Sequence, residues 1–150
     1  MPDFSLASAR NTLLASLVCV GMGHTVLFAV LAPLGRDMGL GEFQINSIIA
    51  ASSLTVFLTS PMWGRVSDQW GRKRVMLVGL FGFVFGTVLF NSVLYVGSAG
   101  LLLGLPLFLG LVVSRVMHAS VMSATMPASN AYMADITDVS TRTKGMGALG

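Results

Sequence analysis

The chain has 150 residues, of which 54% are hydrophobic and only 10% are charged. Because soluble domains carry about 25% charged residues, this composition excludes an ordinary soluble domain and is typical of a membrane protein. The formal net charge of +3 does not indicate nucleic-acid binding, since the basic residues do not alternate with aromatic residues that stack on bases. The single cysteine, Cys19, excludes an intrachain disulfide.

The charge-free intervals predict the membrane spans. Twenty-five residues without a charged side chain lie between Arg10 and Arg36, and 22 lie between Glu42 and Arg65. Each interval exceeds the roughly 20 residues that cross a bilayer as a helix. The first apolar run is also longer than the core of a signal peptide, so we expect it to be retained. The first two predicted spans are residues 13–34 and 43–63.

The next charge-free interval holds two spans. Forty uncharged residues lie between Arg74 and Arg115, which is too many for one crossing. The turn-forming residues 97–100 and the helix-starting Pro106 divide the interval. We expect a kink at Pro127, because proline removes a backbone hydrogen bond. The predicted third and fourth spans are residues 75–96 and 106–134, and residues 145–150 are the start of an expected fifth.

The basic residues predict the orientation. On a zigzag of four spans, seven of the nine basic residues fall on one side of the membrane. The positive-inside rule predicts that this side is cytoplasmic, which places the N-terminus in the cytoplasm of a multi-pass protein of the inner or plasma membrane. The seven residues are Arg10, Arg65, Arg72, Lys73, Arg74, Arg142 and Lys144.

The stretch GRVSDQWGRKRVML, residues 64–77, concentrates charged side chains in a chain that otherwise almost avoids them. Its simplest interpretation is a basic loop that fixes orientation, and this is the better interpretation for each basic residue taken singly. The spacing indicates more, because the stretch fits the pattern G-x-x-x-D-x-x-G-R-K. The residues that fit it are Gly64, Asp68, Gly71, Arg72 and Lys73.

Two glycines and one acid give this pattern its physical content. Gly64 lacks a Cβ and permits close backbone approach, while Gly71 can adopt a left-handed conformation that lets the chain reverse sharply. We therefore expect a tight loop. Within it, Asp68 can accept charge-assisted hydrogen bonds from Arg72. We predict that Asp68, Arg72 and Asp135 form a network. The alternative cations for this network are Arg65 and Arg74.

The pattern resembles the loop signature of the major facilitator superfamily between its second and third helices, although Gln69 stands where that family usually has a basic residue. A second stretch is similar to the fourth helix of the drug:proton antiporter branch of the family. There an Arg is followed by small residues, a Pro and the pattern A-Y-x-A-D-x-T before a basic loop. The matching positions are Arg115, Ala119, Pro127, Ala131, Tyr132, Ala134, Asp135, Thr137 and Arg142.

The resemblance implies an all-α membrane protein with four transmembrane helices and the start of a fifth, as part of an N-terminal six-helix bundle. Carriers of this family have two six-helix halves that rock around a substrate near the midplane. We therefore expect residues 1–150 to be the N-terminal part of such a carrier, with the C-terminal half absent. The expected partners are the lipid bilayer, a small-molecule substrate, protons, and the remaining half of the carrier or a second copy.

The resemblance also implies functional residues. In the family, the loop Asp holds the two halves together in one conformational state, which suggests a latch. Arg115 lies twenty positions before Asp135, about 30 Å along a helix and so in the outer half of the bilayer. It either snorkels to the interface or is a buried cation in the substrate and proton pathway, as in the antiporters. The expected latch residues are Gly64, Asp68, Gly71, Arg72, Lys73 and Asp135.

Three further residues are pathway candidates. His24 lies near the middle of the first span and could carry a proton, although a hydrogen bond to another helix is equally open. The first span has none of the carboxylates that many antiporters carry there. His118 lies one turn from Arg115 and shares its face. Met122 follows on that face, where methionine suits either a variable substrate surface or ordinary packing.

No pattern of a soluble enzyme is present. The sequence has no phosphate loop and no metal-spaced Cys/His cluster, and its few acids do not suggest paired catalysis. We therefore predict a protein that is not an enzyme and that needs neither a cofactor nor a metal. The expected function is the transport of small molecules by alternating access, with proton-coupled efflux as one mode. The alternatives are a non-transporting membrane remnant or adaptor and a small self-assembling carrier.

Overall fold

The computed structural model describes residues 2–136, and the side chains of residue 8 and residues 11–135. Within this part of the chain all regular structure is helical, which confirms the all-α fold class. The predicted start of a fifth span, residues 145–150, lies outside the described residues. The helices are α1 (Pro2–Asp37), α2 (Glu42–Trp70), α3 (Arg72–Ser98), α4 (Gly104–Met122) and α5 (Thr125–Ile136).

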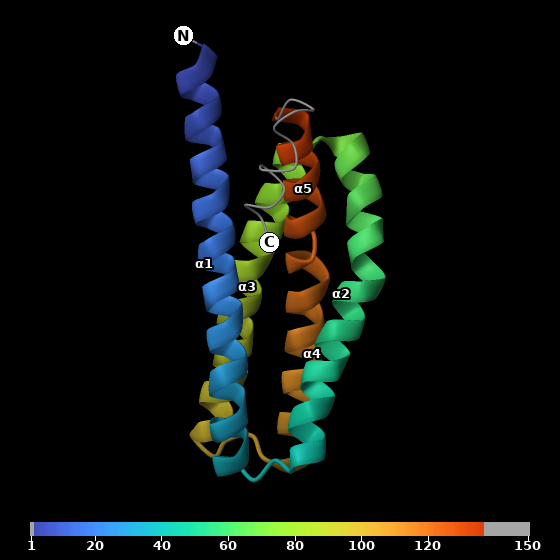
Figure 1. The fold of residues 1–150 in the computed structure, drawn as a ribbon. Helices are drawn as coiled ribbons and strands as arrows, with labels where there is room; N and C mark the ends of the chain where they lie inside the picture. The colour runs from blue at the N-terminus through green and yellow to red at the C-terminus, as the bar shows by residue number, and fades with distance from the viewer. Residues whose placement is uncertain (1, 137–150) are drawn as a thin grey trace.

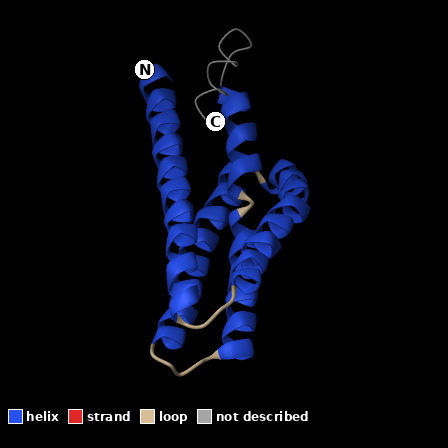
Figure 2. Ribbon diagram, turned by 60° about the horizontal axis from the view of Figure 1, so that its bottom comes forward, coloured by secondary structure: helices blue, strands red, loops and turns tan. Residues whose placement is uncertain are grey.

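The helices run up and down beside one another, and only short connections join them (Figures 1 and 2). The α1–α2 and α3–α4 connections lie at one end, while the α2–α3 junction and α5 lie toward the other end, where α1 begins (Figure 1). The helix α5 continues the course of α4. Within residues 2–136, four segments are long and apolar enough to cross a membrane, which confirms the number of transmembrane helices expected there. They are Asn11–Asp37, Glu42–Trp70, Arg72–Ser98 and Gly104–Asp135.

The expected loop at residues 64–74 is instead a junction of one residue, which corrects the prediction. The helix α2 continues through Gly64 and Asp68 to Trp70, and α3 begins two residues later. Gly71 reverses the chain with φ 93° and ψ 140°, a conformation that only glycine adopts without strain. The predicted close approach at Gly64 is wrong for the described residues, since a Cβ there would meet nothing within 4 Å.

The expected single helix over residues 106–134 is broken into α4 and α5 at Ser123–Ala124. Pro127 explains where the break falls. It has no N–H to donate to the carbonyl of Ser123, four residues earlier, and its ring would clash with that carbonyl. The helix therefore ends one turn before the proline, and Pro127 lies in the first turn of α5, where a missing N–H costs little.

A glycine seam brings α3 close to the fourth span. A Cβ added to Gly86 would lie 2.6 Å from Cβ of His118, and one added to Gly82 would clash with Val121. Because lipid tails are as apolar as the side chains, close contact between small residues is a main source of helix association in membranes. The Gly82-x-x-x-Gly86 pair thus packs on α4.

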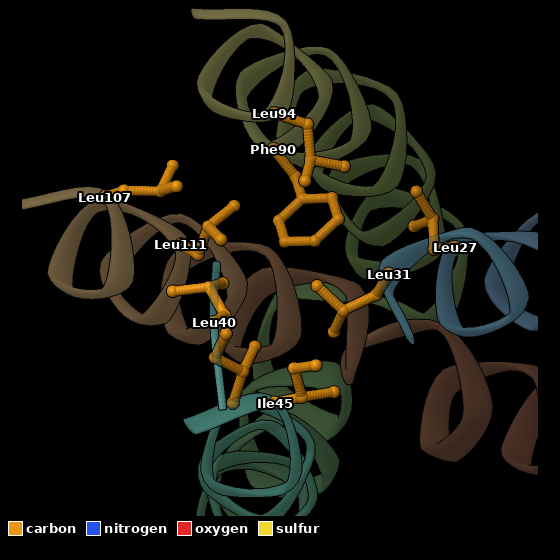
Figure 3. Packing of buried hydrophobic residues seen from close by; sticks show 9 residues of the cluster. Leu27, Leu31, Leu40, Ile45, Phe90, Leu94, Leu107 and Leu111 are labelled. Carbon is orange, nitrogen blue, oxygen red and sulfur yellow. The ribbon is translucent and has the colours of Figure 1, made fainter. Parts of the chain in front are cut away.

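The main apolar cluster lies toward the end of the bundle that holds the α1–α2 and α3–α4 connections, and residues of α1, α2, α3 and α4 contribute to it (Figure 3). It fixes the relative positions of the four spans beside the candidate site. Elsewhere large side chains point outward, such as Phe57 at 75% exposure and Phe81 at 72%, as expected of helices in contact with lipid. The buried cluster comprises Leu27, Leu31, Leu40, Ile45, Ile48, Phe90, Leu94, Leu107 and Leu111.

Candidate functional site: a buried arginine and a charged helix junction

Arg115 is enclosed in the bundle, with only 1% of its surface exposed. Its Nε donates to Oγ of Ser52 on α2 at 3.3 Å, and its Nη1 donates to Nδ1 of His118 at 3.0 Å. A guanidinium has donors but no acceptor, so Nδ1 of His118 must accept and Nε2 carries the proton of the neutral ring. The alternative in which Arg115 snorkels to the interface is therefore wrong for this structure.

Two aromatic rings face the same guanidinium. Cζ of Arg115 lies 4.7 Å from the ring centroid of Phe28 on α1 and 5.4 Å from that of Phe90 on α3. The face of an aromatic ring is electron-rich and attracts a cation within about 6 Å. Among the described side chains of residues 11–135 no carboxylate forms an ion pair with Arg115, and its Nη2 has no hydrogen-bond partner there. The rings and neutral polar groups thus surround a buried cation.

His24 lies beside this group and next to a cavity. Its ring meets that of Phe28 edge-on at 4.8 Å and lies 6.3 Å from that of His118, measured between centroids. The sequence left open a hydrogen bond between His24 and another helix. Within the described part of the chain, Nδ1 of His24 forms no hydrogen bond. A cavity of about 190 Å³ is lined by His24, Met122 and residues of α1, α2 and α5. The four pathway candidates thus lie close together, two on the cavity and two behind it.

Hydrogen bonds hold α2 to the fourth span near this cavity. Nε1 of Trp63 donates to the carbonyl of Ser120 at 2.6 Å. The hydroxyls of Thr59 and Ser123 lie 2.8 Å apart at the break between α4 and α5. These bonds satisfy polar groups that lipid cannot satisfy, and they fix the broken helix against its neighbour.

At the end of the bundle nearer the N-terminus, Arg72 joins three helices. It begins α3 and donates from Nη1 to Asp68 near the end of α2 and from Nε to Oδ2 of Asp135 in α5, the latter at 3.2 Å. These are the two carboxylates that the sequence suggested as its partners. The alternative cations Arg65 and Arg74 form no ion pair with the described residues. The contact is present, and its role as a latch stays a prediction.

The other expected latch residues lie outside this network. Gly71 provides the reversal, whereas Gly64 faces open space. Lys73 lines a separate cavity of about 650 Å³ between α1, α3 and α5, and makes no ion pair in the part of the chain described. Among the basic residues of the stretch 64–77, Arg72 therefore forms ion pairs with described residues, whereas Arg65, Lys73 and Arg74 do not.

Sequence reasoning missed three residues of the Arg115 site, namely Phe28, Ser52 and Phe90. None belongs to a motif, and each lies in an apolar run where the sequence alone cannot distinguish the inner from the outer face. Ser52 follows the pair Ala50–Ala51 in α2, which is a weak signal, because serine also occurs on helix faces that only pack.

The sequence of this chain is similar to those of known proteins. Residues 13–150 match the Major Facilitator Superfamily. The chain is 29% identical over 135 residues to Multidrug resistance protein 2 of Bacillus subtilis, which covers 90% of the chain and 31% of that protein. It is 30% identical over 128 residues to a triacylglyceride transporter of Mycolicibacterium smegmatis, covering 83% of the chain and 21% of that protein. No solved structure matches.

A third relative, Multidrug resistance protein D of Escherichia coli, is 34% identical over 77 residues, which cover 51% of the chain and 20% of that protein. The chain thus spans between a fifth and a third of the length of these three curated relatives. The match to the family covers all but the first twelve residues, including the charged helix junction and the buried arginine. With four apolar spans among its described residues, this multi-pass membrane protein belongs to the Major Facilitator Superfamily.

Proposed function

We propose that this chain forms part of a secondary carrier that moves small molecules across the cell membrane by alternating access, and that it is not an enzyme. The observation that carries the proposal is Arg115, a cation buried inside a membrane-spanning bundle behind the cavity that His24 and Met122 line. Intramembrane charges are costly and commonly mark substrate or ion pathways. Two relatives are named for multidrug resistance and one for triacylglyceride transport, which favours small amphipathic substrates.

The pathway in this proposal runs past the cavity. His24 and Met122 would contact the substrate, and Arg115 with His118 would provide polarity behind them. His24 and His118 are the candidates for proton coupling in this region, since an imidazole ring can bind and release a proton. Efflux driven by protons is the mode that the relatives named for drug resistance favour.

The charged junction would act as the latch of the carrier. Its ion pairs lie at the surface of the bundle, with 28% of the Arg72 side chain and 58% of the Asp135 side chain exposed. Ion pairs at such a position can break and re-form as a carrier changes conformation. We propose that this end faces the cytoplasm, in accord with its basic residues, and that the remaining half of the carrier or a second copy completes the transport path.

Efflux from cells tests this function. The complete reading frame that encodes this chain is expressed in a bacterial strain without its main drug pumps, and efflux of ethidium and of a neutral lipophilic dye is followed by fluorescence. We expect faster efflux than in empty cells, a loss of at least about tenfold for Arg115→Ala, and normal efflux for Phe81→Leu on the exposed face. Collapse of the proton gradient should stop efflux. Equal efflux of both dyes by cells with and without the protein would contradict the proposal.

A further inference from the structure

The buried cation Arg115 has no counter-ion in the part of the chain that the structure describes. A charge removed from water usually requires an opposite charge nearby. The carboxylates of residues 11–136 all lie near helix ends, and those in ion pairs join Arg36 and Arg72. They are Asp37, Glu42, Asp68 and Asp135. Among the described side chains, any negative potential at Arg115 therefore comes from uncharged groups.

The ring faces of Phe28 and Phe90 supply it. Both centroids lie within the range in which an aromatic face attracts a cation, at 4.7 Å and 5.4 Å from Cζ. The two rings come from different helices. Phe90 lies on α3 and is fully buried in the apolar cluster, which fixes the position of its ring. Phe28 lies on α1, is only half-buried, and makes the shorter contact.

Phe28 also contacts the cavity side of the site. The ring of His24, which lines the cavity, meets the ring of Phe28 edge-on at 4.8 Å and 88°. A single ring therefore contacts both the buried cation and a histidine that faces the cavity. A change at the cavity that displaced Phe28 would remove one face of the cation's surroundings.

We infer that Phe28 is a positioning residue for Arg115: its ring holds the guanidinium toward Ser52 and His118 in place of a carboxylate. The inference rests on the proposed function where it concerns transport. The contact itself can be tested without measuring transport, because it also contributes to the stability of the folded protein.

Fluorination of one ring tests the inference without changing its shape. Phenylalanine with one, two and three ring fluorines is placed at position 28 of the complete carrier, since each fluorine withdraws electron density from the ring face. The midpoint of thermal unfolding in detergent and the transport rate should both fall stepwise, with the rate falling by about tenfold at three fluorines, the size of a desolvated cation–π contact. Phe28→Leu should match the trifluorinated variant.

Two matched controls separate electrostatics from packing. The same series at Phe81, which is 72% exposed, should leave both quantities unchanged. In the Arg115→Gln background, the series at position 28 should no longer change the unfolding midpoint. A flat series at position 28 would overturn the inference, as would unfolding midpoints that fall while transport stays constant. If the unmodified carrier transports nothing, the proposed function fails, and the unfolding series alone then decides the contact.

Discussion

Arg72 and Asp135, which lie 63 positions apart in the sequence, form an ion pair with Nε and Oδ2 3.2 Å apart. Because Arg72 also pairs with Asp68, the start of α3 is tied to the ends of both α2 and α5. Two carboxylates share one guanidinium, so removing either acid still leaves the cation a partner. This redundancy determines what mutation of the junction should show.

Single neutralisations of the junction should be mild and the double neutralisation severe. We expect Asp68→Asn and Asp135→Asn each to retain part of the transport, and the double variant to lose more than the product of the two single effects. Thermal unfolding should change little, since exposed ion pairs contribute little stability. Glu42→Gln, which breaks the pair with Arg36 at the opposite end, is the control. Wild-type transport by the double variant would exclude a latch at this junction.

The two glycines of the charged pattern should differ in their response to alanine. Gly71 has φ 93°, so Gly71→Ala should destabilise the protein by about 1–2 kcal/mol. Gly64 lies inside α2 with open space around it, so Gly64→Ala should stabilise it by up to about 1 kcal/mol. Unfolding by denaturant in mixed micelles measures both changes. Equal effects at the two positions would contradict the helix junction at Gly71.

The glycine seam should not tolerate a methyl group at Gly86. An added Cβ would lie 2.6 Å from Cβ of His118, so α3 and α4 must separate or His118 must shift. We expect Gly86→Ala to cost about 1–3 kcal/mol of unfolding free energy, as overpacking does, and to lower transport. At Gly21 nothing lies within 4 Å of an added Cβ, so Gly21→Ala serves as the control for the unfolding free energy alone, because Gly21 lines the cavity beside His24. An unchanged unfolding free energy for Gly86→Ala would contradict the close contact between α3 and α4 at Gly86.

The two tryptophans provide another matched pair. Trp63→Phe removes the hydrogen bond to the carbonyl of Ser120 and should lower the unfolding free energy by about 1 kcal/mol. Trp70 is 60% exposed, so Trp70→Phe should have a smaller effect. The account of how α2 is fixed to the broken span fails if Trp70→Phe is the more destabilising change.

The sequence was sufficient for the spans because charge has a large cost in lipid, so uncharged intervals mark the membrane. It also indicated the contact of Arg72 with Asp68 and Asp135, since few acids were available near one membrane surface. The length of the connection between α2 and α3 was predicted wrongly, because the reversal of the chain needs only the single residue Gly71. The sequence also placed the kink at Pro127, although the helix yields at the preceding turn.

The surroundings of Arg115 were beyond the sequence for a different reason. Phe28 and Phe90 are two of nine phenylalanines, and in a membrane helix an aromatic residue suits a lipid-facing and a buried position alike. Phe81 faces outward and Phe90 inward on the same helix. Only the packing of α1 and α3 against α4 determines which ring meets the cation.

The central claim is that the chain crosses the membrane four times with its charged junction on the cytoplasmic side. The accessibility of single cysteines to a labelling reagent tests this claim most directly. Cys19→Ser removes the native thiol, and Lys73→Cys or Leu101→Cys then provides one thiol at each end of the bundle. In intact cells a membrane-impermeant maleimide should label position 101 and leave position 73 unlabelled until the cells are opened. Labelling of position 73 from outside, or of both positions alike, would contradict the account.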